Sequence, residues 1–402
     1  MRVIKELLLA AVITVVFFTV LMVMLPSSVV VERSIEINRP LVQVYDVASS
    51  FKQFPAWSPW GQRDPTTQYA AVSQELTGPG AEISWRSERD ERVGEGALRI
   101  VEQTPMEEMK YELDAPWRGD KRARLRMEEN EAGAIVTTFT VNVDYDWDLF
   151  GRVTGRYLDG HLGNDLNHAL GQLKNRIEAL PDVDYSAAFE DKPPVEVESG
   201  PINVMLIPGQ ASTREPYSIQ PTVMNFTRIL TATIDIKNLT QTGPRLAVLK
   251  RWGQNYDFDA AVPVSETEAT DLPENVVFTT IGEGRYLKVN YQGARWDLPR
   301  QRDMLLAWAG AHGYLTSTGI IEEFLNDRGG EGEDAIRDAD LETNIYLPLR
   351  EPGEVEDEYD LPAEEEPVNG NGDSAGQEDA DGDQTAEDND GNDEAAAQAD
   401  TD

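Results

Sequence analysis

The sequence predicts an α+β protein with a transmembrane helix at its start, two folded domains and a disordered acidic tail. Three observations support this fold class. An apolar segment of bilayer length lies near the N-terminus, a series of alternating strands ends in a long amphipathic helix, and a strand–helix–strand–strand pattern then occurs twice. A length of 402 residues agrees with two or three folded units.

Composition excludes several classes of function. Asp and Glu number 73 against 35 Lys and Arg, a net charge of −38, which disfavours an electrostatic grip on nucleic acid. The absence of cysteine removes thiol nucleophiles, disulfides, iron–sulfur clusters and thiolate zinc sites, and only three histidines remain. We therefore expect no nucleic-acid partner, no metal and no other cofactor.

The membrane segment runs from Leu7 to Leu25, 19 residues without a charge. As a helix it would span about 28 Å, close to the hydrocarbon thickness of a bilayer. A cleaved signal peptide is the alternative, but this apolar stretch exceeds the usual length of a signal-peptide core. Arg2 and Lys5 precede the span. We expect residues 1–28 to be an uncleaved anchor with a cytoplasmic N-terminus, and the domains to be periplasmic or otherwise extracytoplasmic.

Two further segments differ in composition from the folded parts. Residues 351–402 hold 21 acidic and no basic side chains, so this tail should be disordered. Such a tail could bind cations or a basic partner, although the favoured interpretation is a hydrated extension that keeps the protein in solution. Residues 181–194, acidic and bounded by prolines, are predicted to be an interdomain linker.

The first domain, residues 29–180, is predicted to open with a half-buried strand over 29–38 and a helical stretch over 40–54. A long amphipathic helix with its apolar stripe from Val153 to Leu180 closes it. Between them the alternation of apolar and polar residues predicts six strands, at about 69–74, 81–88, 94–102, 108–114, 122–129 and 134–144.

This order resembles the helix-grip fold of the START, polyketide cyclase and dehydrase-like (SRPBCC) superfamily. The opening VVVERSIEINRPLVQVYDVASSFKQFPAWSPW, the GPGAEISWRS hairpin, the VGEGALRIVE strand and the closing helix carry the resemblance. It implies a curved sheet around the long helix and an apolar cavity for a lipid or another hydrophobic ligand. The candidate wall residues are Trp57, Trp60, Trp85 and Trp117, each of which could instead be an ordinary core aromatic.

No catalytic residue follows from this resemblance. His161 and His168, seven residues apart on the closing helix, share a face, but the apolar stripe of that helix runs elsewhere. A solvated or capping role is favoured for the two histidines.

The second domain, residues 195–350, contains an internal repeat. Each half is predicted to be a βαββ unit, so two units side by side should form a sheet with both helices on one face and a cleft at their junction. The predicted segments are 202–207, 220–237, 245–252 and 257–263 in the first half, and 276–291, 298–312, 320–326 and 343–349 in the second.

That layout resembles the effector-binding domain shared by AraC-type regulators and the DNA gyrase inhibitory protein family. The segments YLKVNYQG, LLAWAGAHGY, IIEEFLND and ETNIYLPL occur in the family's order. The resemblance implies a small amphipathic or cationic ligand, bound near Glu322 as the central glutamate, with Phe324 beside it and Trp308 and Tyr346 as aromatic walls. Arg295 departs from the family pattern and would bring a positive charge to the rim of the ligand-binding pocket.

Neighbouring residues of a strand face opposite sides, so only one of Glu322 and Glu323 should point inward, and the resemblance favours Glu322. We expect a membrane-anchored protein that binds small hydrophobic or amphipathic molecules, as a sensor or carrier. A hydrolase or cyclase using Glu322 as acid or base is the first alternative, and a structural envelope protein is the second. Binding is favoured over catalysis because no nucleophile or oxyanion donor accompanies the glutamate.

Overall fold

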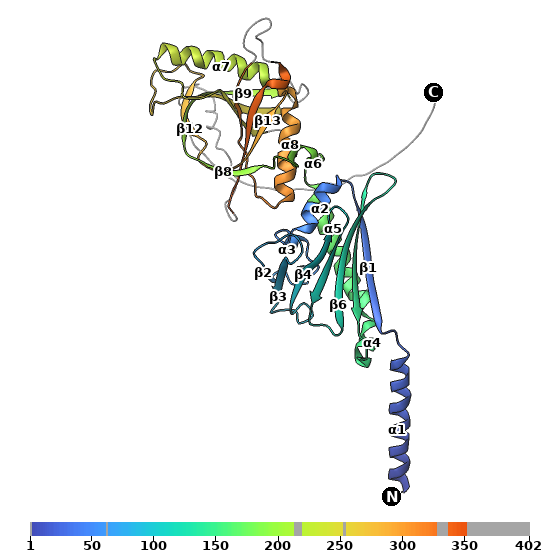
Figure 1. Ribbon diagram of the computed structural model, residues 1–402. Helices are drawn as coiled ribbons and strands as arrows, with labels where there is room; N and C mark the ends of the chain where they lie inside the picture. Colours follow the sequence, from blue (N-terminus) through green and yellow to red (C-terminus); the bar gives the residue numbers. More distant parts are fainter. Residues whose placement is uncertain (1, 62, 213–218, 252–254, 328–336, 352–402) are drawn as a thin grey trace, which may run out of the picture. The chain divides into compact units, whose positions relative to one another are not determined.

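The computed structural model describes residues 2–61, 63–212, 219–251, 255–327 and 337–351 (Figure 1). It is a mixed α+β structure with an apolar N-terminal helix and two antiparallel sheets, as the sequence predicts. Apart from Glu351, the acidic tail expected from residue 351 onward lies outside the described residues.

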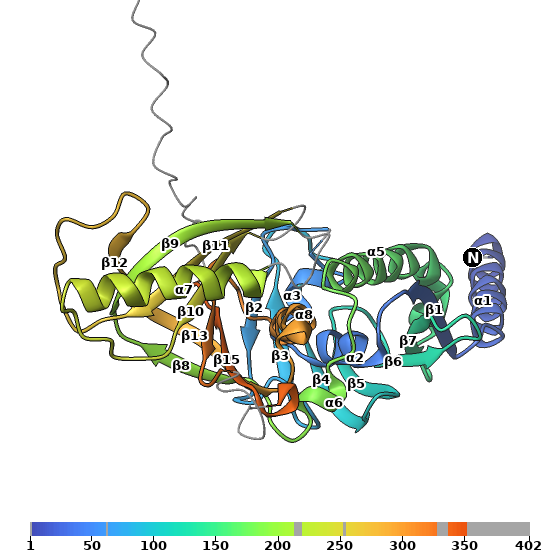
Figure 2. The ribbon, with the colours of Figure 1, turned by 90° about the horizontal axis from the view of Figure 1, so that it is seen from above.

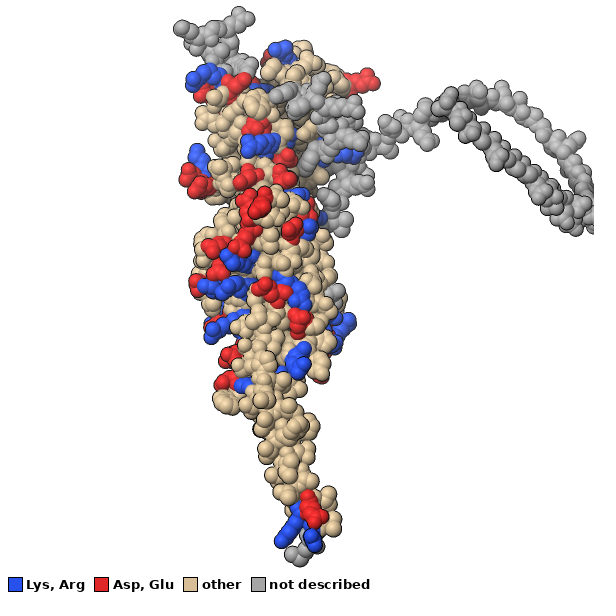
Figure 3. Space-filling view, turned by 90° about the vertical axis from the view of Figure 1, so that its right-hand side faces the viewer, with Lys and Arg blue, Asp and Glu red and all other residues tan. Residues whose placement is uncertain are grey.

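The N-terminal helix α1 spans Arg2–Val23 and is long and apolar enough to cross a membrane. None of its residues is buried. Its charged side chains, at Arg2, Lys5 and Glu6, all lie in the first turns, and the rest of the helix surface is uncharged (Figure 3).

The first sheet, sheet A, has seven antiparallel strands in the order β1-β7-β6-β5-β4-β3-β2. The chain returns across the sheet so that the first and last strands pair, with Ser28 opposite Asp144. The strands are β1 (Ser28–Ile37), β2 (Gln68–Ala71), β3 (Glu82–Arg86), β4 (Glu95–Thr104), β5 (Glu108–Asp114), β6 (Asp120–Glu129) and β7 (Ile135–Asp144).

Alternation along these strands separates a core face from a solvent face. In β6, Leu125 and Met127 are buried whereas the arginines at 122, 124 and 126 point outward. The core face packs on helix α5 (Leu158–Glu178), whose buried residues recur at threes and fours from Leu162 to Ile177. Shorter helices complete the domain: α2 (Leu41–Ser49), α3 (Phe54–Trp57) and α4 (Leu149–Gly155).

Two segments differ from the sequence prediction in detail. The long closing helix is divided into α4 and α5, and Asp148 caps α4 by accepting a hydrogen bond from the Gly151 N–H at 3.0 Å. The predicted linker contains a short helix, α6 (Ser186–Phe189), beside the buried Tyr185. The Tyr185 hydroxyl donates to Asp46 of α2 at 2.6 Å, so this segment packs on the first domain.

The second sheet, sheet B, has eight antiparallel strands in the order β12-β9-β11-β10-β14-β15-β13-β8. The predicted repeat is present, since β9, α7, β10 and β11 correspond to β13, α8, β14 and β15. The two halves meet where β10 pairs with β14. The elements are β8 (Val195–Ser199), β9 (Ile202–Ser212), α7 (Ile219–Ile236), β10 (Leu246–Arg251), β11 (Asn255–Pro263), β12 (Val277–Ile281), β13 (Gly284–Gln292), η1 (Arg295–Asp297), α8 (Leu298–Ala311), β14 (Ile320–Phe324), η2 (Asp338–Asp340) and β15 (Glu342–Pro348).

The two edge strands of sheet B are exchanged between the halves. Strand β8 precedes the first half but pairs with β13 of the second, and β12 precedes the second half but pairs with β9 of the first. The sequence predicts one nearly continuous strand over 276–291. The chain instead turns between β12 and β13 at Gly282 and Gly284, both at positive φ, so that β12 forms one edge of the sheet and β13 lies beside β8 at the other.

Sheet B has a helix face and an open face. Helices α7 and α8 pack against the helix face, which includes Phe258, Ile320 and Ile345 (Figure 2). The open face carries a separate apolar cluster, with Leu246, Ile321 and Tyr286 among its members. Both helices therefore cover one side of the sheet, as predicted, and leave the other side without a helix in the described part of the chain.

Close packing of the first domain can be tested with a matched pair of glycine substitutions. A Cβ at Gly96 of β4 would lie 2.3 Å from the Trp85 indole and 2.5 Å from the Asp114 carbonyl oxygen, whereas a Cβ at Gly171 of α5 would meet no atom within 4 Å. Gly96→Ala should lower the free energy of unfolding by about 1–3 kcal/mol through overpacking. Gly171→Ala should raise it by up to about 1 kcal/mol because alanine favours a helix. Urea unfolding followed by circular dichroism would compare them, and equal midpoints would contradict this packing.

Candidate functional site

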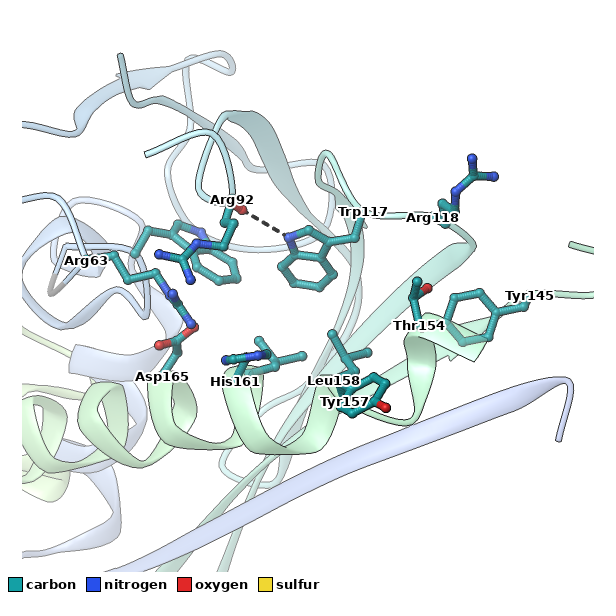
Figure 4. Close-up of a pocket in the computed structure, with 12 residues that line it drawn as sticks. Arg63, Arg92, Trp117, Arg118, Tyr145, Thr154, Tyr157, Leu158, His161 and Asp165 are labelled. Atoms are coloured by element: carbon teal, nitrogen blue, oxygen red, sulfur yellow. Dashed lines mark hydrogen bonds and ion pairs between the residues drawn. The ribbon is translucent and has the colours of Figure 1, made fainter. Parts of the chain in front are cut away.

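A cavity of about 210 Å³ opens between sheet A and the start of helix α5 (Figure 4). We call it the arginine cavity, because three arginines contribute to its wall along with aromatic and aliphatic side chains. Its lining residues are Trp60, Arg63, Arg92, Trp117, Arg118, Tyr145, Thr154, Tyr157, Leu158, His161, Leu162 and Asp165.

Charged groups concentrate at one end of the arginine cavity. Arg63 Nε donates to the Asp165 carboxylate at 2.8 Å, and both side chains are largely buried. Figure 4 shows the Arg92 guanidinium reaching in beside this pair, whereas Arg118 points away. Burial raises the pKa of Asp165, and the hydrogen bond from Arg63 partly offsets that shift. Two guanidinium groups thus converge on one end of an otherwise apolar space.

The four candidate tryptophans fall into two groups. Trp60 and Trp117 line the cavity, and their rings meet edge to face with centroids 5.6 Å apart. The Trp117 indole donates to the backbone carbonyl of Arg92 at 3.2 Å (Figure 4). Trp57 packs edge to face on Phe54 in the core and does not touch this cavity.

Trp85 packs against Trp60, which lines the arginine cavity, but does not line the cavity itself. Its ring lies 5.2 Å from that of Trp60, and its indole donates to the Val93 carbonyl at 3.2 Å, which satisfies its only donor. The Trp60 indole is also buried, but its N–H has no hydrogen-bond partner among the described residues. A buried donor without a partner costs about 1–3 kcal/mol.

Sequence reasoning missed the arginines and the role of one histidine. Arg63, Arg92 and Arg118 come from three loops, so no periodicity joins them. His161, for which a solvated role was favoured, lines the cavity one turn before Asp165, whereas His168 does not. No group of three or more His, Asp or Glu residues among the described residues could hold a metal ion.

The second candidate site is a smaller cavity of about 80 Å³ on the open face of sheet B. We call it the carboxylate cavity, after Glu323. The Glu323 carboxylate accepts hydrogen bonds from the Tyr346 hydroxyl at 2.8 Å and the Asn344 amide at 2.7 Å. Its lining residues are Ser199, Ile202, Leu246, Gly282, Tyr286, Ile321, Glu323 and Tyr346.

Two tyrosine rings form the aromatic part of this cavity. Tyr286 and Tyr346 meet edge to face with centroids 6.2 Å apart, and Lys288 Nζ lies 5.1 Å from the Tyr346 ring centroid. Burial raises the pKa of Tyr346, and the neighbouring Glu323 raises it further, so this hydroxyl stays a donor at neutral pH. An anion beside aromatic rings is an arrangement that attracts organic cations.

Glu322 lies on the opposite face of strand β14. Its carboxylate is fully buried against helix α8, where it forms an ion pair with Arg302, and Arg302 also donates to the Tyr256 hydroxyl at 3.4 Å. Burial works against the charge of Arg302, but Glu322 outweighs it and raises the pKa of Arg302. Glu322 therefore does not line the carboxylate cavity, and its role as the ligand-binding anion stays a prediction.

Of the other residues carried over by resemblance, only Tyr346 lines this cavity. Phe324 is buried on the helix face between the guanidinium groups of Arg245 and Arg295, at 4.4 and 4.8 Å from its ring centroid. Arg295 also pairs with Asp327 at 2.6 Å, so it lies away from the cavity rim. Trp308 stacks on His312 with centroids 4.0 Å apart. The ligand contacts proposed for Phe324 and Trp308 stay predictions.

Two protein families match this chain, in the order that the sequence predicts. Residues 28–178 match the family described as polyketide cyclase / dehydrase and lipid transport, and residues 252–350 match the GyrI-like small molecule binding domain. Both descriptions include the carriage or binding of small molecules, which supports ligand binding by this chain. No curated protein matches it.

Solved structures resemble parts of the chain. The C-terminal domain of EcmrR shares 16% identity over 40% of this chain and 98% of its own, with a TM-score of 0.33. A START superfamily protein from Mycobacterium smegmatis shares 13% identity over 37% of this chain and 97% of its own, with a TM-score of 0.30. These TM-scores are too low to support an argument about function.

The roles of the two adjacent glutamates can be separated experimentally. Glu322→Gln should leave Arg302 as an uncompensated buried charge and lower the free energy of unfolding by about 3–5 kcal/mol. Glu323→Gln should change stability little and weaken binding of a small organic cation such as tetramethylammonium, whose size suits a cavity of about 80 Å³. Urea unfolding and calorimetric titration would measure the two effects. Lost cation affinity in Glu322→Gln at unchanged stability would instead assign the ligand-binding role to Glu322.

Proposed function

We propose that this protein is a membrane-anchored binding protein for small hydrophobic or amphipathic molecules, acting as a sensor or a carrier. Its first domain matches a cyclase and lipid-transport family, and its second matches a small-molecule binding family. The observation that carries the proposal is the arginine cavity, which combines aromatic walls with two guanidinium groups at one end.

The chemistry of this cavity favours an amphipathic ligand with an anionic group. Trp60, Trp117 and Leu158 offer apolar surface, while Arg63 and Arg92 offer charge-assisted donors for a carboxylate or phosphate. About 210 Å³ holds a small molecule or one end of a longer one. Tyr157 lines the cavity while its side chain is 70% exposed, so the cavity is open there and a longer ligand could extend out.

The carboxylate cavity favours the opposite charge. Glu323, Tyr286 and Tyr346 form a small acidic and aromatic space, which suits a cationic head group rather than a whole drug-sized molecule at about 80 Å³. We propose that the two domains bind ligands of different charge.

Catalysis is the second candidate function. Glu322 is fully buried and ion-paired, whereas a general acid or base must reach its substrate. Asp165 lines a cavity and has a raised pKa, so we propose that it would be the acid or base of a cyclase-type reaction. Asp165→Asn should then abolish turnover of a bound substrate, and undiminished turnover in that variant would exclude this role.

The ligand prediction can be tested with a matched pair of probes, 2-naphthoate and its neutral amide. The full chain in nanodiscs should bind the carboxylate more tightly, because Arg92 can donate to it. Arg92→Gln should weaken carboxylate binding by roughly five- to tenfold and leave amide binding unchanged, as expected for one partly exposed charged hydrogen bond. Arg92 pairs with Asp90 at 3.2 Å, but it is preferred to Arg63, which pairs with the more deeply buried Asp165.

Calorimetry would give both affinities, with Arg86→Gln as the control. Arg86 is an exposed arginine of β3 that pairs with Glu95 and lies outside the cavity. Equal affinities for the two probes would contradict the anionic ligand. Binding of neither probe, together with no co-purifying molecule in native mass spectrometry, would favour a structural envelope protein.

The proposed topology makes a separate prediction. With α1 in the bilayer and its N-terminus in the cytoplasm, protease added to intact spheroplasts should degrade both domains, because they would lie outside. Immunoblotting with an antibody against the second domain would show the loss. Protection of the domains until the cells are lysed would reverse the orientation.

A further inference from the structure

Three large aromatic side chains stand exposed where the chain passes from sheet A to helix α5. Trp147, Phe150 and Tyr157 have exposed fractions of 74%, 66% and 70%. We call them the aromatic face. Single exposed apolar residues are ordinary on protein surfaces, but three large rings within one short connection indicate a surface that meets something apolar.

The covalent chain holds this face near the end of the membrane helix. Helix α1 ends at Val23 and strand β1 begins at Ser28, where Ser28 pairs with Asp144. The Tyr145 N–H also donates to the Ser27 carbonyl at 2.7 Å. The few residues between Val23 and Ser28 reach at most about 15–20 Å when fully extended. The aromatic face therefore stays close to the bilayer surface for any direction of α1.

Arg152 of α4 fixes this arrangement more closely. Its guanidinium donates to the carbonyl oxygens of Val23 at 3.0 Å and Leu25 at 3.2 Å, and to the Asp146 carbonyl at 2.9 Å. The last carbonyls of a helix lack partners within it, so a basic side chain there is stabilising. The same guanidinium lies 5.8 Å from the Trp147 ring centroid, which joins the end of α1 to the aromatic face.

We propose that the aromatic face docks into the interfacial layer of the bilayer that α1 spans. Tryptophan and tyrosine favour the membrane interface, because their rings are apolar and their N–H or O–H groups reach the head groups. The nearby charges are of both signs, so docking does not require anionic lipid. They include Arg118, Arg152 and Arg156 on the basic side and Asp144, Asp146, Asp148 and Asp159 on the acidic side. This inference rests on the proposed anchor and not on ligand binding.

Quenching of tryptophan fluorescence by brominated lipid tests the docking. The full chain is placed in nanodiscs of phosphatidylcholine, with or without bromine at carbons near the head-group end of one acyl chain. Bromine quenches only indoles in contact with it, so the brominated discs should lower the fluorescence of the chain. Trp147→Phe should abolish most of this quenching while keeping an aromatic ring in place.

Trp296→Phe is the matched control, since Trp296 is 55% exposed but belongs to η1 of the second domain. This variant should keep the full quenching. Quenching that is the same in Trp147→Phe as in the unchanged chain would overturn the docking, as would quenching that appears only when phosphatidylglycerol is added. Whether the chain is recovered together with the nanodiscs tests the membrane anchor separately. A chain that does not incorporate into the discs would contradict both the anchor and the docking. The binding of 2-naphthoate in the arginine cavity would be unaffected by that outcome.

Discussion

The alternation of side chains across antiparallel strands is the constraint on which both candidate sites depend. In sheet A it turns Leu125 and Met127 toward α5 and leaves the neighbouring arginines in solvent. In sheet B it sends Glu322 toward α8 and Glu323 toward the open face. A shift of one residue in the register of β14 would exchange these two carboxylates and bury the wrong one.

The ion pair between Glu322 and Arg302 shows how this constraint is used. A charge on the helix face of the sheet must be compensated within the core, and α8 supplies Arg302 for that purpose. Glu323 needs no such partner in the core, and two neutral donors, Tyr346 and Asn344, orient it instead. Its negative charge is thus left for the open face of sheet B.

Much of the fold was predictable, because the strands are short, regular and separated by turns. The order of elements in sheet A, the repeat in sheet B and the cavity-lining Trp60 and Trp117 all follow from periodicity or from resemblance. Neither periodicity nor resemblance could decide between Glu322 and Glu323. Alternation shows that the two side chains face opposite sides of the sheet, but it does not show which side the helices cover. The arginine cavity was equally hidden, because Arg63, Arg92 and Arg118 are distant in sequence and meet only after the sheet has curved. The exchange of β8 and β12 depends on pairing between segments that are distant in sequence, and a local sequence pattern does not show which distant strands pair.

That exchange determines the order in which the second domain can be completed. During synthesis β8 emerges first, yet its partner β13 follows only after the whole first half and β12 have been made. Until then β8 has no strand to pair with, and β9 likewise waits for β12 to cover its outer edge. Pairings between such distant segments slow folding. Neither half can therefore finish alone, and the sheet closes at both edges only when nearly all of its chain is available.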